Sequence, residues 1–136
     1  MSAAELVAEL SSRINIVEEA YEFMLAYASQ GLASDEGSDP GRQAREYLKR
    51  CDTALTSLGE FLNGFTDRVG VDPVAPYRAF IAVIDRDARD AQAAIQLVLA
   101  QPSISSQLVD NLNASIHLRA LLTDLFLIDE VFKTHH

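Results

Sequence analysis

Apolar residues follow one another at alternating spacings of three and four along four long segments of this sequence, and no other feature constrains the fold as strongly. The first stripe consists of Val7, Leu10, Ile14, Val17, Tyr21, Met24 and Ala28. Because an α-helix turns about 100° per residue, such spacing gathers these side chains on one face of a helix. No segment shows the period-two alternation of a half-buried β-strand. The sequence therefore predicts an all-α protein.

Short turn-forming stretches separate the four segments. Residues 34–41, 69–76 and 101–106 collect the Gly, Pro, Ser and Asp that favour turns and helix caps. The helices are expected near residues 3–33, 40–68, 73–100 and 104–133. Connections this short bring consecutive helices together as antiparallel pairs. A chain of 136 residues suffices for one domain, so we predict that residues 1–136 form a single up-down antiparallel four-helix bundle.

Two glycines interrupt the helix expected over residues 40–68. Gly59 and Gly64 each cost roughly 1 kcal/mol relative to alanine inside a helix. Their presence indicates either that another helix approaches closely at this point, or that the last turn of the helix loosens after Asn63.

The helix expected over residues 104–133 carries two apolar stripes. The first consists of Leu118, Leu121, Leu125, Ile128 and Phe132. The second lies on roughly the opposite side and consists of Val109, Leu112, Ile116, Ala120, Leu127 and Val131. Such a helix is either buried on two faces or kinked between them, and the polar stretch from Asn111 to Asn113 suits a kink.

A partner interface is expected on this last helix. Phe126 and Leu127 fall on a side that Arg119, Thr123 and Glu130 mark as facing solvent, where a monomer would expose them and an interface would bury them. The expected interface residues are Leu112, Ile116, Phe126 and Leu127. The preferred hypothesis is a non-enzymatic interaction protein, a homodimeric helical bundle that acts as an adaptor, an assembly factor or a small chaperone.

The formal net charge is −9, and acids gather near the N-terminus. Residues 1–39 hold eight acids and a single base, Arg13. A surface of this sign repels phosphate backbones and anionic lipid, so the sequence predicts neither a nucleic-acid partner nor a membrane partner. The N-terminus lacks the features of a signal peptide, no apolar run is long enough to span a bilayer, and the single cysteine, Cys51, forms no intrachain disulfide. These features favour a cytoplasmic protein.

The residue patterns that hold cofactors in helical bundles are missing from the sequence. A di-iron bundle needs Glu-x-x-His pairs, but the residue three before His117 is Ala114. The sequence has no cysteine cluster and no Gly-rich phosphate loop. We therefore expect no metal, no cofactor and no catalytic residues. His135 and His136 end the sequence and could be the remnant of a purification tag.

Two other functions stay open as alternatives. A small molecule could bind or react between the helices, at a site lined by the aromatic residues Tyr21, Tyr27, Tyr47, Phe61 and Tyr77. His117 could serve phosphotransfer, since histidine phosphotransfer proteins are also helical bundles with an exposed histidine. Those proteins usually place a lysine and a small residue after the histidine, whereas Arg119 and Ala120 stand near His117 here.

Acid–base catalysis by paired carboxylates is a further possibility. The acids that stand four apart on one helix, or flank an apolar stripe, are Glu18, Glu22, Asp85, Asp87, Asp124 and Asp129. Catalysis would require a pocket and a shifted pKa at one of these pairs. Asp129 stands among Leu122, Leu125 and Phe132, and a simpler role for it is an ion pair with a neighbouring helix.

Overall fold

The four apolar stripes fold into six α-helices. The computed structural model describes residues 2–134, and within this range it contains no β-strand. The helices are α1 (Ala3–Ala28), α2 (Asp39–Leu55), α3 (Leu58–Val69), α4 (Val74–Leu99), α5 (Ser106–Ala114) and α6 (His117–Thr134). The all-α prediction is confirmed. The prediction of one helix over residues 40–68 was wrong, because it is broken after Leu55, and the helix expected over residues 104–133 is kinked, which was one of its two alternatives. His135 and His136 lie outside the described residues.

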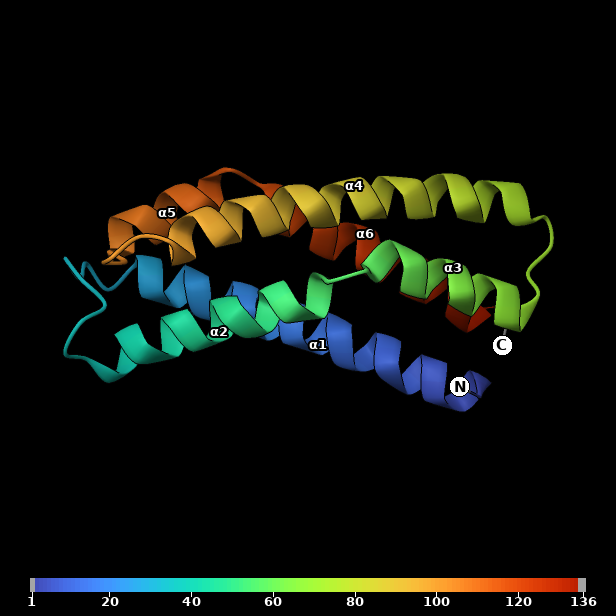
Figure 1. Ribbon diagram of the computed structural model, residues 1–136, viewed down its shortest axis with the longest axis horizontal. Coiled ribbons are helices and arrows are strands. Elements are labelled where there is room, and N and C mark those ends of the chain that lie inside the picture. The colour runs from blue at the N-terminus through green and yellow to red at the C-terminus, as the bar shows by residue number, and fades with distance from the viewer. Residues whose placement is uncertain (1, 135–136) are drawn as a thin grey trace.

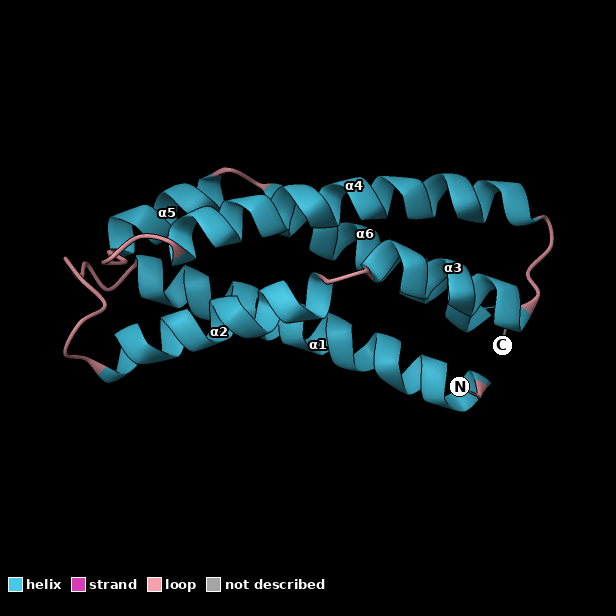
Figure 2. Ribbon diagram, viewed as in Figure 1, coloured by secondary structure: helices cyan, strands magenta, loops and turns pink. Residues whose placement is uncertain are grey.

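All six helices run roughly along the long axis of the molecule (Figure 1). α1 packs against α2, α5 and α6, whereas α4 packs against α2, α3 and α6. Loops gather at the two ends of the molecule, and two short breaks lie between them, one separating α2 from α3 and the other α5 from α6 (Figure 2). Within residues 2–134, each helix is either too short or too polar to cross a lipid bilayer.

The apolar stripes form the core between the helices. Along α4, every stripe residue from Ile81 to Val98 is buried. On α1 the buried face lies slightly to one side of the expected stripe, so that Leu6 and Tyr27 are buried while Val7 is exposed. The three-four spacing therefore identified the correct side of each helix, to within about one residue.

Polar side chains cap the first two helices. The Ser2 hydroxyl accepts the N–H of Glu5 at 3.1 Å, and the Glu5 carboxylate accepts the N–H of Ser2, which together make a capping box. α1 ends at Ala28, five residues earlier than expected. The Ser38 hydroxyl caps α2 by accepting the N–H of Gly41 at 3.1 Å.

Side chains from other helices stabilise the break between α2 and α3. Nη1 of Arg13 donates to the carbonyl oxygens of Ala54 and Thr56, at 3.1 and 3.0 Å. Nε2 of Gln92 donates to the carbonyl oxygen of Asp52 at 3.0 Å. Carbonyl oxygens at a helix end have no partner in their own helix, and these donors satisfy them. Arg13 and Gln92 thus join α1 and α4 to the end of α2.

Gly59 lets α4 approach the start of α3. A Cβ atom at Gly59 would lie 2.6 Å from Oδ1 of Asp85, which is too close for a real contact. This confirms the expectation of a close helix approach at Gly59. At Gly64 no atom lies within 4 Å of such a Cβ, so close approach does not explain that glycine.

Ser57 adopts a left-handed backbone conformation at this break, with φ 55° and ψ 30°, and its side chain forms no capping hydrogen bond. We predict that Ser57→Gly raises the free energy of unfolding by about 0.5–1 kcal/mol, because glycine reaches this conformation without steric cost. Urea unfolding followed by circular dichroism measures the change. Ser57→Ala keeps the Cβ atom and should give no gain; an equal gain in both variants would contradict the explanation.

The break between α5 and α6 lies at Ser115 and Ile116. Ile116 has a positive φ of 62°, and the Ser115 hydroxyl donates to the carbonyl oxygen of Leu112 at 2.6 Å. The expected kink is therefore present, just after Asn113. It turns Val109 and Leu112 into the core even though they belong to the second stripe. The first stripe, on α6, stays buried as well.

A buried polar network closes the end of the molecule where residues 29–38 meet residues 100–105. Asp35 accepts the N–H of Ile104 at 2.6 Å and forms an ion pair with Arg45. Nη2 of Arg45 also donates to the carbonyl oxygen of Gln101 at 2.9 Å. The Tyr27 hydroxyl donates to the carbonyl oxygen of Ile104 at 2.8 Å. These bonds connect α1, α2 and the turn after α4.

Asp35 is held in its ionised form despite being buried. Burial alone would raise the pKa of Asp35, but its hydrogen bonds from Arg45 and from the N–H of Ile104, together with the positive charge of Arg45, bring it below its usual value. A lowered pKa means that the stabilisation is present above the usual pKa of an aspartate and is lost as the pH falls through the lowered value.

Asp35→Asn should lower the free energy of unfolding by about 2–3 kcal/mol at neutral pH, since it leaves the half-buried Arg45 guanidinium without its counter-charge. It should also reduce the loss of stability below about pH 4. Thermal unfolding at several pH values measures both effects. Asp39→Asn is the matched control, because Asp39 pairs with Arg42 on the surface, and it should cost only a small fraction as much. Equal losses in the two variants would contradict a special role for Asp35.

Candidate functional site

An apolar groove lies between α4 and α6. It encloses about 250 Å³ and is lined by Pro76, Tyr77 and Phe80 from α4 and by Leu127, Ile128 and Val131 from α6. On each helix two adjacent residues are followed by a third that stands three and four positions after them, so both sets face the same groove. All six lining residues are apolar or aromatic, and none carries a charge. The groove therefore suits an apolar side chain from another molecule.

The outer side of α6 continues this apolar surface. Leu127 is 53% exposed and Phe126 is 45% exposed, and both flank the polar residues Arg119, Thr123 and Glu130. Ile116, at the break before α6, is 58% exposed. We call these three residues, together with the groove, the α6 surface. Three of the four expected interface residues therefore lie on the surface of the monomer.

Leu112, the fourth expected interface residue, is buried. Only 7% of it is exposed, because the break at Ser115 and Ile116 turns α5 so that Leu112 faces the core. Its assignment to an exposed stripe assumed one straight helix, and that assumption was wrong.

Asp87 on α4 and Asp124 on α6 form a carboxyl pair across the same two helices. Burial, together with the neighbouring Asp87 as a hydrogen-bond partner and as a negative charge, raises the pKa of Asp124 to about 7. Oδ2 of Asp124 is shielded from water and accepts no hydrogen bond from a described donor. Protonation of Asp124 supplies the hydrogen for a bond to Asp87, so the pair is best satisfied with one proton.

The Asp124 pair should make the protein less stable as the pH rises. Because the pKa of Asp124 is raised in the folded state, its stabilisation is complete below the usual pKa of an aspartate and is lost as the pH rises through about 7. We predict that Asp124→Asn raises the free energy of unfolding at pH 8 by roughly 1–2 kcal/mol, a range reduced for solvent screening of this half-buried group.

Urea unfolding at pH 5 and at pH 8 tests this prediction, with Asp129→Asn as control. Asp129 forms an ion pair with Lys133 at 3.0 Å on the surface, so its loss should change stability little at either pH. If wild type and Asp124→Asn lose the same stability between pH 5 and pH 8, the pair does not hold a proton in the folded state.

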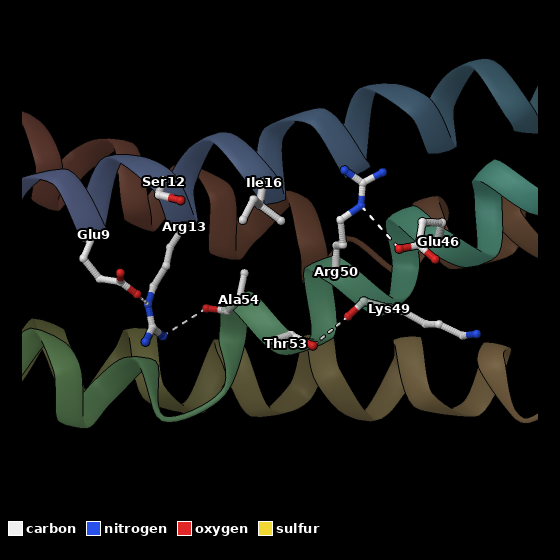
Figure 3. Close-up of a pocket in the computed structure, with 9 residues that line it drawn as sticks. All are labelled: Glu9, Ser12, Arg13, Ile16, Glu46, Lys49, Arg50, Thr53 and Ala54. Carbon is white, nitrogen blue, oxygen red and sulfur yellow. Dashed lines mark hydrogen bonds and ion pairs between the residues drawn. The ribbon is translucent and has the colours of Figure 1, made fainter.

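A charged hollow of about 410 Å³ lies between α1 and α2 (Figure 3). Two ion pairs line it, each within one helix: Nε of Arg13 with Glu9 at 3.0 Å on α1, and Nε of Arg50 with Glu46 at 3.9 Å on α2. Figure 3 shows the Arg13 side chain reaching across to the carbonyl oxygen of Ala54, a hydrogen bond that joins α1 to the end of α2.

Of the residues considered for catalysis, Asp87 and Asp124 meet, whereas His117 and Asp129 are not brought to them. His117 is exposed in the first turn of α6, and no hydrogen bond or ion pair joins it to another residue within the described chain. Cys51 is buried, and burial with a smaller contribution from the charge of Asp52 raises the pKa of its thiol to about 12, which keeps it protonated. Asp129 pairs with Lys133 on its own helix, so the expected pairing with a neighbouring helix was wrong.

Metal-ligating side chains do not cluster in the part of the chain that the structure describes. Within residues 2–134, no three His, Cys, Asp or Glu side chains lie close enough together to hold a metal ion.

The five aromatic residues considered as one ligand site are divided between two aromatic clusters and the edge of the core. Tyr27 and Tyr47 both stack on Phe23, with ring centroids 6.4 and 4.6 Å from it. Phe61 and Tyr77 belong to a second cluster, in which they contact Phe65 and Phe132 respectively. Tyr21 packs half-buried against the core.

Sequence reasoning missed the contribution of α4 to the α6 surface. Phe80 stands three residues after Tyr77 and away from the buried stripe, and a large apolar residue at such a position was the available signal. It also missed that Asp87 and Asp124 meet, because both acids are visible in the sequence but their proximity depends on how α4 packs against α6.

Comparison of the chain with protein-family models, with curated proteins and with solved structures gives no match. The functional argument therefore depends on the geometry of this chain alone.

Proposed function

We propose that this protein is a non-enzymatic interaction protein that forms a homodimer through the α6 surface and acts as an adaptor, an assembly factor or a small chaperone. In this proposal the six helices constitute an up-down antiparallel four-helix bundle, in which α2 with α3 and α5 with α6 are two interrupted helices. The contacts of α1 with α2 and α5, and of α4 with α2, α3 and α6, support this arrangement.

The exposure of Leu127 beside the α4–α6 groove is the observation that carries the proposal. A large apolar side chain that stays in water forfeits roughly 1.5–3 kcal/mol relative to full burial. Ile116 and Phe126 add to the same exposed surface. Large exposed apolar residues beside an apolar groove are typical of a protein–protein interface. A twofold interface would bury it against its own copy.

The distribution of charge favours self-association at this surface. α1 carries five acids and one arginine, so two copies that met through α1 would repel each other. α4, which borders the α6 surface, carries three arginines and three aspartates and has no net formal charge. The acidic α1 also supports the proposal that neither nucleic acid nor a membrane is a partner. The cytoplasmic location expected from the sequence stays a prediction.

Sedimentation velocity of the wild type and of Leu127→Glu tests the proposed homodimer. We predict that the wild type is a dimer at micromolar concentration, and that Leu127→Glu is a monomer because a charge replaces an apolar contact at the interface. Leu25→Glu is the matched control: Leu25 on α1 is 47% exposed, and its substitution should leave the dimer intact. A monomeric wild type, or a Leu127→Glu protein that is still dimeric, would place any interface elsewhere.

A further inference from the structure

Arg119 and Glu130 are two opposite charges on the outer side of α6. They stand eleven residues apart, which amounts to about three helical turns, so both point to the same side at a separation of roughly 16 Å along the axis. Both are exposed, and neither forms an ion pair with another residue of the described chain. Lys133 on α6, by contrast, pairs with Asp129 at 3.0 Å.

Between these two charges, α6 carries a seam suited to helix pairing. Ala120, Thr123 and Leu127 follow one another at spacings of three and four, and Glu130 stands three residues after Leu127. Two helices that pack side by side use residues at this spacing as their contact positions. The small residues Ala120 and Thr123 allow a second helix to come close, and Leu127 supplies the large apolar contact.

The structure points to a particular arrangement of two copies, and this inference rests on the proposed homodimer. We propose that α6 pairs with α6 of a second copy in antiparallel orientation, so that Arg119 of each copy lies opposite Glu130 of the other. A twofold axis level with the midpoint between Arg119 and Glu130 generates this contact twice. Thr123 of one copy then lies level with Phe126 of the other.

The two charges select this orientation. A parallel pairing in the same register would bring Arg119 against Arg119 and Glu130 against Glu130, and like charges across an interface are strongly disfavoured. The antiparallel pairing converts both repulsions into attractions. The surface is therefore complementary to itself, which is the property that a second copy requires and an unrelated partner does not.

Charge reversal at the two positions tests the register. Arg119→Glu and Glu130→Arg should each weaken the dimer about tenfold in Kd, since each places two pairs of like charges across the interface. The double variant Arg119→Glu/Glu130→Arg should return the Kd to within about twofold of the wild type. Sedimentation equilibrium gives the Kd values, and circular dichroism confirms that each variant is folded.

Two variants distinguish the effect of the register on the Kd from that of general repulsion between acidic chains. Glu130→Arg makes the chain less acidic, so general repulsion alone would predict a tighter dimer, whereas the register predicts a weaker one. Lys49→Glu, an exposed substitution on α2 with the same charge change as Arg119→Glu, should alter the Kd by less than about twofold.

The outcomes separate this inference from the proposed function. A wild type that is monomeric overturns both. A dimer that Leu127→Glu disrupts, but in which the charge reversals have no effect or the double variant does not recover, supports the proposed homodimer and overturns the antiparallel register. Loss in both single variants with recovery in the double variant supports the register.

Discussion

The buried ion pair of Asp35 with Arg45 is the interaction on which one whole end of the molecule depends. It lies where two loops and three helices meet, and Asp35 also accepts the N–H of Ile104 from the turn after α4. A carboxylate out of water is unfavourable unless charge and hydrogen bonds compensate it, so the loops can take few other positions. Gly41 fits this arrangement because a Cβ atom there would overlap the backbone of Asp35.

The middle of the molecule follows a related rule, in which helix ends are satisfied by distant side chains. The carbonyl oxygens at the end of α2 accept hydrogen bonds from Arg13 on α1 and Gln92 on α4. Nδ2 of Asn113, close to the second break, likewise donates to the carbonyl oxygen of Met24 on α1 at 3.2 Å. These hydrogen bonds join α1 and α4 to the end of α2 at the first break, and α5 to α1 near the second.

The sequence alone was sufficient to predict the helical class and most of the core residues, but not the positions of the two helix breaks. Burial depends on local spacing, so the stripe from Leu118 to Phe132 was predicted correctly. The break at Ser57 depends on Arg13, a residue more than forty positions away, and local patterns do not contain that contact. The error at Leu112 has the same origin: a period of 3.6 extrapolates only along a continuous helix, and the left-handed residue Ile116 resets the phase.

Ile116 connects the fold to the α6 surface. A β-branched residue at positive φ is sterically less favourable than glycine, and its side chain here is largely in water, so neither the backbone nor the core of the monomer benefits from isoleucine at this position. Leu127 also does not benefit the monomer, because a polar residue at this exposed helix position would be equally stable. Local choices that disfavour the isolated monomer are expected at functional sites. Both choices occur on the same surface of α6, and a contact that buries both residues accounts for them together.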